Sequence, residues 1–139
     1  MDKNVEWVNE QKILRTIKAL EANNINGYFV KDEKELISKI EELVKEGSKV
    51  TCGGSMSLFE TGVMEHLRSG RYDFSDRNKE GLTPEEVINI YKSAFFSDAY
   101  FTSSNAVTEK GELYNVDGNG NRVAAMLYGP EKVIVVCGV

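Results

Sequence analysis

The fold is decided by the stretch Lys49-Val50-Thr51-Cys52-Gly53-Gly54-Ser55-Met56-Ser57-Leu58-Phe59-Glu60. Its first four residues are typical of a strand, and the two glycines with Ser55 interrupt that strand. An apolar stripe at helical spacing follows, made by Leu58, Phe59, Val63 and Leu67. In an open α/β sheet, a loop between such a strand and helix lies at the carboxyl end of the strand, where ligands bind. The stretch therefore predicts an α/β fold with a polar loop at the edge of its sheet.

The rest of the chain alternates between helical and strand patterns. Further helices are predicted over residues 5–23, 36–44, 84–95 and 122–128, the third beginning with Thr83 as N-cap and Pro84 as first helical residue. Further strands are predicted at residues 27–30, 72–74, 99–102 and 133–136, the last buried on both faces. A hairpin is predicted to join Ala106-Val107 to Leu113-Tyr114. This order favours a mainly parallel sheet with helices on both faces.

Composition bounds the class of protein. The chain has 139 residues, which suits one domain over 1–139, and 41% hydrophobic residues suffice for a core without disulfides. A net charge of −5 argues against non-specific binding of nucleic acid. Neither a signal peptide nor an apolar run of membrane-spanning length is visible, so we expect a cytoplasmic protein with no membrane partner. Cys52 and Cys137 are expected to be buried, and with one histidine they predict no metal site.

The Gly-Gly-Ser loop is the first candidate site. Gly53 and Gly54 let a ligand approach the backbone, and Ser55 is a good N-cap for a helix whose N-terminus attracts anions. The alternative is a tight turn that binds nothing.

Two more polar segments are candidates for the same edge. Thr102, Ser103, Ser104 and Asn105 follow a predicted strand and offer hydroxyls and an amide, or else form a turn that satisfies its own backbone. The second segment comprises Asn115, Val116, Asp117, Gly118, Asn119, Gly120, Asn121 and Arg122. There Asn119 or Asn121 could cap the following helix, and Arg122 could fork onto a carboxylate or phosphate. Its alternative is an ordinary loop.

Carboxylates are the remaining candidates. Glu60, one turn into the helix after the glycines, and Glu109, beside the Ser-Asn segment, could each act as a general base or be structural. Asp76 and Arg77 are expected to form an ion pair with each other.

Four motifs in this order resemble the lactate utilization protein family (the LUD domain, LutC/YkgG-like). They are residues 52–62, Arg68-Ser69-Gly70, residues 103–109 and residues 115–124, and the likeness runs from about Glu10 to Val139. The resemblance implies a three-layer α/β/α sandwich similar to the NagB/RpiA/CoA-transferase fold. It also implies a bacterial protein linked to oxidation of L-lactate to pyruvate alongside iron–sulfur partner proteins.

The chain departs from the family pattern in two ways. The further helix and cysteine-containing tail of longer members are expected to be lacking, so no iron–sulfur ligand is carried over. If Ser104-Asn105-Ala106 is the counterpart of the Glu-Asn-Gly motif of CoA-transferases, the glutamate nucleophile is absent.

Three hypotheses follow, and no cofactor is named. The leading one is a domain that binds a small phosphate-, carboxylate-, CoA- or nucleotide-like anion at the strand carboxyl edge. The second is a transferase or isomerase of the CoA-transferase fold with a carboxylate base. The third is a non-catalytic assembly subunit for iron–sulfur partners, and a homodimer is expected if an apolar face stays bare.

Overall fold

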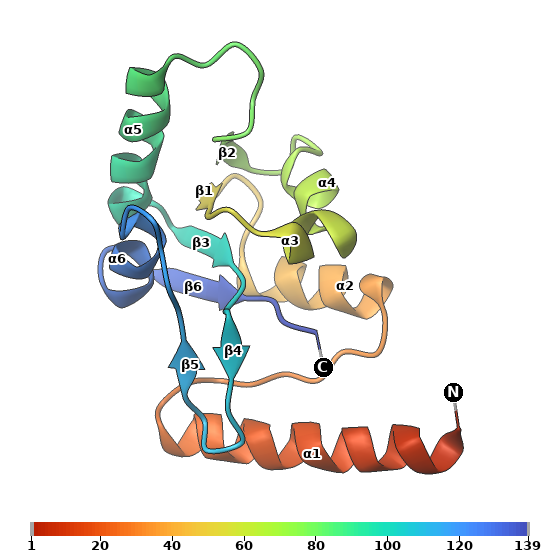
Figure 1. Ribbon diagram of the computed structural model, residues 1–139. Coiled ribbons are helices and arrows are strands. Elements are labelled where there is room, and N and C mark those ends of the chain that lie inside the picture. Colours follow the sequence, from red (N-terminus) through yellow and green to blue (C-terminus); the bar gives the residue numbers. More distant parts are fainter. Residues whose placement is uncertain (1, 139) are drawn as a thin grey trace.

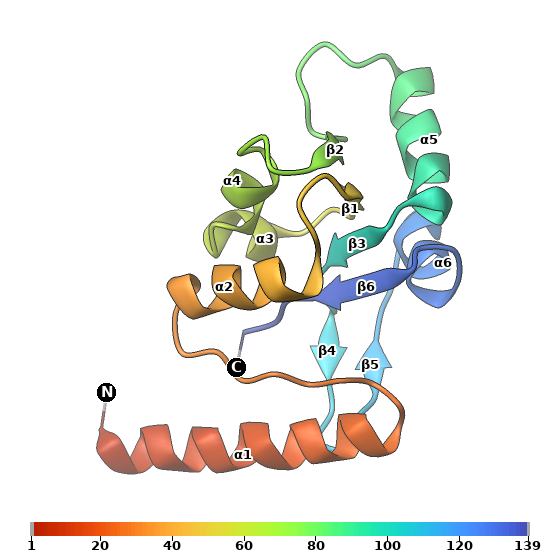
Figure 2. The same ribbon diagram turned by 180° about the vertical axis from the view of Figure 1, so that it is seen from behind.

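A four-stranded parallel sheet organises the chain. The computed structural model describes residues 2–138. Its main sheet has the strand order β2-β1-β3-β6, and every neighbouring pair is parallel. The strands are β1 (Lys49–Cys52), β2 (Asp73–Ser75), β3 (Ala99–Thr102) and β6 (Lys132–Val135). Helices cover both faces of the sheet, α2, α3 and α4 on one side and α5 and α6 on the other (Figures 1 and 2). The α/β/α sandwich predicted from the sequence is confirmed.

The helices follow the predicted pattern, except that one predicted helix is divided into α3 and α4. They are α1 (Lys3–Ala22), α2 (Glu33–Leu43), α3 (Met56–Glu60), α4 (Val63–Leu67), α5 (Pro84–Ser93), the 3₁₀ helix η1 (Ala94–Phe96) and α6 (Asn121–Leu127). Helix α5 begins as predicted, because the Thr83 hydroxyl accepts a hydrogen bond from the Glu86 amide and Pro84 is the first helical residue. Within residues 2–138, no helix combines the length and apolar character needed to cross a bilayer.

The central strand β3 divides the core between the two faces of the sheet. Successive side chains of a strand point to opposite faces. Ala99 and Phe101 therefore belong to the larger apolar cluster, with α2, α3 and α4, whereas Tyr100 packs with Ala94 and Ala125 on the side of α5 and α6. All four residues of β3 are buried, which gives the neighbouring loops a fixed base.

Four local predictions were wrong. Residues 27–30 pair with no strand of either sheet, and Gly27 packs against α1, where an added Cβ would lie 3.0 Å from the Ile17 side chain. The expected single helix over 58–67 is two short helices, because Gly62 takes φ +76° between them. Strand β6 is half-buried rather than buried, since it is an edge strand of the sheet. Cys52 is buried as expected, but Cys137, beyond the end of β6, is exposed.

The predicted hairpin links the sheet to α1. Strands β4 (Ala106–Val107) and β5 (Leu113–Tyr114) pair antiparallel, and their turn reaches α1 in Figure 1. The Asn23 side-chain amide at the end of α1 donates hydrogen bonds to the carbonyls of Lys110 and Gly111. Gly111 has φ +80° and lies so close to α1 that an added Cβ would be 2.6 Å from the Ala19 carbonyl. This contact requires a residue without a side chain.

We predict that Gly111→Ala destabilises the domain by more than the strain of a left-handed alanine, which costs about 1–2 kcal/mol. Gly47→Ala is the matched control, because Gly47 has φ +82° and an added Cβ there meets nothing within 4 Å. Urea unfolding of both variants measures the difference. Equal losses of stability would contradict the close approach of the hairpin turn to α1.

Candidate functional site

A polar cavity of about 270 Å³ lies at the carboxyl ends of β1, β2 and β3. It is lined by Gly54, Arg77, Tyr91, Asn105, Val116, Asp117, Gly118, Asn119, Asn121 and Arg122. Each of the three segments singled out in the sequence contributes to this lining. Segments that are far apart in the chain therefore meet at one edge of the sheet.

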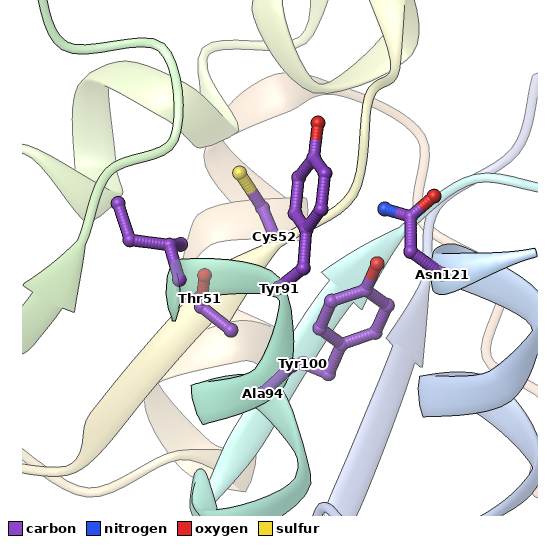
Figure 3. A pocket seen from close by; sticks show the side chains of 7 residues that line it. Thr51, Cys52, Tyr91, Ala94, Tyr100 and Asn121 are labelled. Atoms are coloured by element: carbon purple, nitrogen blue, oxygen red, sulfur yellow. The ribbon is translucent and has the colours of Figure 1, made fainter. Parts of the chain in front are cut away.

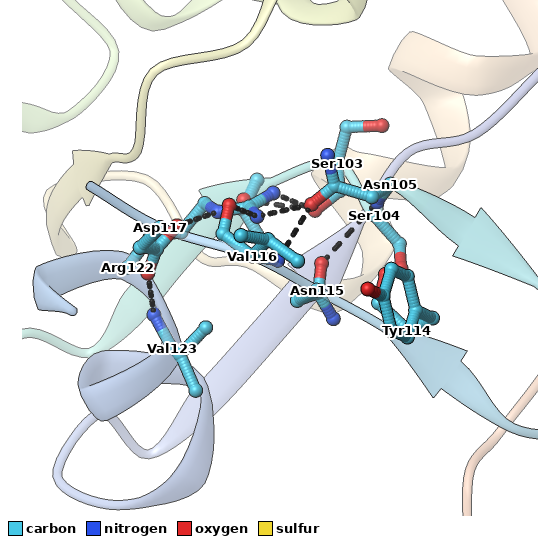
Figure 4. Close-up of polar contacts among 10 residues, drawn as sticks. Ser103, Ser104, Asn105, Tyr114, Asn115, Val116, Asp117, Arg122 and Val123 are labelled. Carbon is cyan, nitrogen blue, oxygen red and sulfur yellow. Dashed lines mark hydrogen bonds and ion pairs between the residues drawn. The ribbon is translucent and has the colours of Figure 1, made fainter.

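A buried ion pair holds the loop before α6. The Arg122 Nε donates to Asp117 Oδ1 at 2.9 Å, and both side chains are about one-tenth exposed or less. The Arg122 Nη1 reaches the Ser103 carbonyl at 3.1 Å, and Nη2 reaches the Asn105 side-chain oxygen at 2.7 Å (Figure 4). The guanidinium thus ties the end of β3 to the start of α6.

Asp117 also caps α6. Its second carboxylate oxygen accepts a hydrogen bond from the Val123 amide at 2.6 Å, whereas Asn119 and Asn121, the predicted caps, do not cap the helix. Burial alone raises the pKa of Asp117, but the hydrogen bonds from Val123 and Arg122 together with the Arg122 charge outweigh it, so the pKa lies below its usual value. Asp117 is therefore a carboxylate at neutral pH.

Several polar groups at the base of the hairpin form hydrogen bonds with one another. The Ser104 hydroxyl donates to the carbonyls of Ala106 and Tyr114, and the Asn115 side-chain oxygen accepts from the Asn105 amide. The Asn105 side-chain oxygen accepts from the Val116 amide as well as from Arg122. Figure 4 shows the contacts of Asn105 with Asn115, Val116 and Arg122. Of this group, Asn105 lines the cavity, whereas Ser103, Ser104 and Asn115 do not.

The loop after β1, Gly53-Gly54-Ser55, lies close to Tyr100 and Arg122. An added Cβ at Gly53 would lie 2.7 Å from the Tyr100 hydroxyl and 3.0 Å from Arg122 Cγ, so only glycine fits there. The Gly53 amide is bonded to the Phe101 carbonyl. Gly54 is exposed and lines the cavity. Ser55 makes no capping hydrogen bond, contrary to prediction, and its hydroxyl is buried without a partner among the described residues.

Sequence reasoning missed Arg77 and Tyr91. The Arg77 Nη2 donates to the Tyr91 hydroxyl at 2.9 Å, and the guanidinium lies 4.8 Å from the centre of the Tyr91 ring. The predicted Asp76–Arg77 ion pair is wrong, because Asp76 pairs with Arg68 at 2.7 Å. One signal was present in the sequence: Arg77 follows β2 as the other cavity loops follow β1 and β3.

A narrow crevice adjoins the cavity and shares Tyr91 and Asn121 with it. It is too tight to admit water, and the side chains of Cys52, Tyr91, Tyr100 and Asn121 point into it (Figure 3). Burial raises the pKa of the Cys52 thiol to about 12 and also raises the pKa of Tyr100. Both groups therefore stay protonated, and Cys52 is a poor nucleophile.

The two glutamates proposed as bases lie outside the lining of the cavity. Glu60 is exposed at the end of α3. Glu109 lies at the turn of the hairpin, where it pairs with Lys12 of α1 at 3.7 Å rather than lying beside the Ser-Asn segment. Among residues 2–138 there is no group of three or more His, Cys, Asp or Glu side chains placed to hold a metal ion.

We expect Asp117→Asn to lower the free energy of unfolding by about 3 kcal/mol at neutral pH, because it leaves the buried Arg122 charge unpaired. The depressed pKa of Asp117 stabilises the fold above the pKa of the unfolded chain, and that stabilisation is lost as the pH falls through the folded pKa. The gap between wild type and variant should therefore shrink below about pH 4. Urea unfolding from pH 3 to 7 measures it.

Asp76→Asn is the control for this experiment. Its partner Arg68 has a side chain that is 42% exposed, so the loss should stay below about 1 kcal/mol. Similar losses for the two variants would contradict the structural role assigned to the Asp117–Arg122 pair.

Comparison with known proteins identifies the family. The model of the LUD domain matches residues 13–139, which is all but the first twelve residues of the chain. Searches among curated proteins and among solved structures gave no match. The match agrees with the resemblance drawn from the four sequence motifs, and the chain belongs to the LUD domain family.

Proposed function

We propose that this LUD domain serves lactate utilization by binding a small anionic molecule in the cavity at the carboxyl edge of the sheet. One observation carries the proposal. The loops after β1 and β3 and the loop before α6 line the same cavity, although they are separated by up to about seventy residues of chain. Such convergence of polar loops at a strand edge is the usual position of a ligand site in open α/β folds.

The charges of the lining favour an anion. Arg122 is paired with Asp117, so these two charges cancel. No ion pair joins Arg77 to a carboxylate among residues 2–138, and its Nε is buried without a partner. The cavity therefore has one uncompensated positive charge, that of Arg77. A partly enclosed cation attracts an anion more strongly than the same charge in open solvent.

The backbone beside Arg77 is accessible. Gly54 carries no side chain, and a Cβ added there would lie 3.3 Å from Arg77 Nη1. Among the hydrogen bonds of residues 2–138, none uses the Gly54 amide. An anion at this point could thus accept hydrogen bonds from the guanidinium and from the main chain. Phosphate, carboxylate, CoA and nucleotide groups all meet this requirement.

Base catalysis has less support than binding. Asp117 is the one carboxylate among the described residues that line the cavity, and both of its oxygens accept hydrogen bonds from Arg122 or Val123. Its depressed pKa makes it a weak base. We therefore assign Asp117 to the support of the cavity.

We predict that a panel of anions raises the thermal stability of the wild-type domain and that Arg77→Met abolishes this effect. Phosphate, lactate, pyruvate, CoA and AMP form the panel, read by differential scanning fluorimetry at low salt. An anion present at about 100 times its Kd stabilises the folded state by about 2.7 kcal/mol. The shift should weaken as sodium chloride screens Arg77.

Arg68→Met is the matched control, because Arg68 also lies over an aromatic ring, that of Phe59, but does not line the cavity. It should keep the full response to anions. The proposal fails if no anion stabilises the wild type, or if both variants respond as the wild type does.

A second candidate, docking of iron–sulfur partner proteins, is favoured by α1. None of the residues of α1 is buried, and Trp7 is 63% exposed beside Val5 and Val8. Large exposed apolar groups of this kind mark interaction surfaces. We expect tagged wild-type protein to capture iron-containing material from a lactate-grown lysate and Trp7→Glu to lose it. Equal iron in both captures, or none in either, would contradict docking through α1.

A further inference from the structure

The residues that line the cavity restrict which class of anion can bind there. We propose that the ligand is a hydroxylated monocarboxylate, a sugar acid in chemical class, with its carboxylate against Arg77 and Tyr91 and its hydroxyls toward the amides of Asn105, Asn119 and Asn121. This inference rests on the proposed anion site. It follows from the number of charges, the arrangement of donors and the size of the cavity.

The count of charges favours a single negative charge on the ligand. Because the Asp117 carboxylate neutralises the charge of Arg122, Arg77 is the one lining residue among those described whose positive charge can balance the anion. A carboxylate brings one negative charge, whereas a phosphate monoester brings about 1.5 to 2 at neutral pH. Arg77 alone would not balance the excess charge of a phosphate. A monocarboxylate therefore fits better.

Arg77 and Tyr91 form a pair of adjacent donors. The Tyr91 oxygen accepts from Arg77 Nη2 at 2.9 Å, so the proton of the phenol is available for a second acceptor in the cavity that Tyr91 lines. The guanidinium retains further N–H groups, and its Nε has no partner among the described residues. Two neighbouring donors, one of them charged, suit the two oxygens of one carboxylate.

Three of the other lining residues, Asn105, Asn119 and Asn121, carry side-chain amides. The Asn105 side-chain oxygen is occupied by Arg122 and the Val116 amide, which leaves its NH₂ group as a donor. The side chains of Asn119 and Asn121 make no hydrogen bond to residues 2–138, although both line the cavity. Each amide offers donors and an acceptor, and a hydroxyl group does the same. Amide-rich lining is therefore complementary to a ligand with several hydroxyls.

The lining disfavours a nucleobase. Tyr91 is the one aromatic ring among the described lining residues, and the Arg77 guanidinium already lies over it at 4.8 Å. Stacking on aromatic faces is the usual anchor of a base. A ligand recognised here must gain its affinity from polar contacts instead.

The size of the cavity favours a ligand longer than lactate. The cavity has a volume of about 270 Å³ and is open to solvent. A three-carbon acid anchored at Arg77 would leave most of this space, and the amides of Asn119 and Asn121, to water. A six-carbon sugar acid would occupy more of it and carries hydroxyls that could bond to the amides.

Isothermal titration calorimetry with four probes tests the inference: gluconate, lactate, glucose and glucose 6-phosphate. We expect gluconate to bind tightest, lactate and glucose 6-phosphate each at least about tenfold more weakly, and glucose without detectable heat. Lactate lacks the hydroxyls that reach the amides, glucose lacks the charge, and glucose 6-phosphate carries excess charge.

Two variants test the contacts of the carboxylate end and of the hydroxyl end of the ligand separately. Tyr91→Phe removes one donor to the carboxylate and should weaken gluconate and lactate alike, by about tenfold. Asn119→Ala should weaken gluconate but leave lactate unchanged. Tyr128→Phe is the control, because Tyr128 is 83% exposed and does not line the cavity, and it should change neither Kd.

The outcomes distinguish this inference from the anion site on which it rests. If none of the anions here or in the thermal panel binds, both fail. If glucose 6-phosphate or lactate binds as tightly as gluconate, the sugar-acid inference fails and the anion site stands. An unchanged gluconate Kd in Asn119→Ala or in Tyr91→Phe would likewise overturn the assigned orientation.

Discussion

The ion pair between Arg122 and Asp117 is the constraint on which the site depends. Arg122 is the second residue of α6, and Asp117 lies in the loop before it. The remaining guanidinium bonds reach Ser103 and Asn105 after β3 and the Val116 carbonyl. A buried pair of this kind is stable only because almost every polar atom around it has a partner. It fixes two loops against each other while the rigid, buried strand β3 supplies their base. The same contacts keep Gly53 close to Arg122, so the first loop is positioned by the pair as well.

The two arginines at this edge have opposite roles. Arg122 is surrounded by acceptors from its own chain, and its charge is cancelled, so it acts as a structural crosslink. Arg77 lies over the ring of Tyr91 and donates to its hydroxyl, but it has no carboxylate partner among the described residues. A protein keeps an uncompensated, partly enclosed guanidinium at some cost to its stability. The anion proposed for this cavity would restore the balance.

The sequence predicted the fold and the convergence of the polar loops better than the contacts of single residues within them. Strand and helix patterns with Gly53 and Gly54 placed the polar loops at one edge, because the carboxyl ends of parallel strands share an edge. The role of Arg122 could not be predicted, since its acceptors come from segments whose spacing in the fold is set by tertiary packing. Arg77 was assigned to Asp76 because the two are adjacent in sequence, yet they lie at a turn after β2 where Asp76 pairs with Arg68 and Arg77 bonds to Tyr91. The break at Gly62 was missed because an apolar stripe at helical spacing continues across it.

The density of polar residues in the segment 102–122 has two separate causes. Ser104, Thr108 and Asn115 bond within the hairpin, and Asp117 and Arg122 bond to each other, so these residues build the scaffold. Asn119 and Asn121 make no such bonds among residues 2–138, and both line the cavity. Composition alone cannot separate the two groups, because a hydroxyl or amide is equally suited to capping a turn and to holding a ligand. Only the hydrogen-bond partners divide them, and that division leaves the amides of Asn119 and Asn121 lining the same cavity as Arg77.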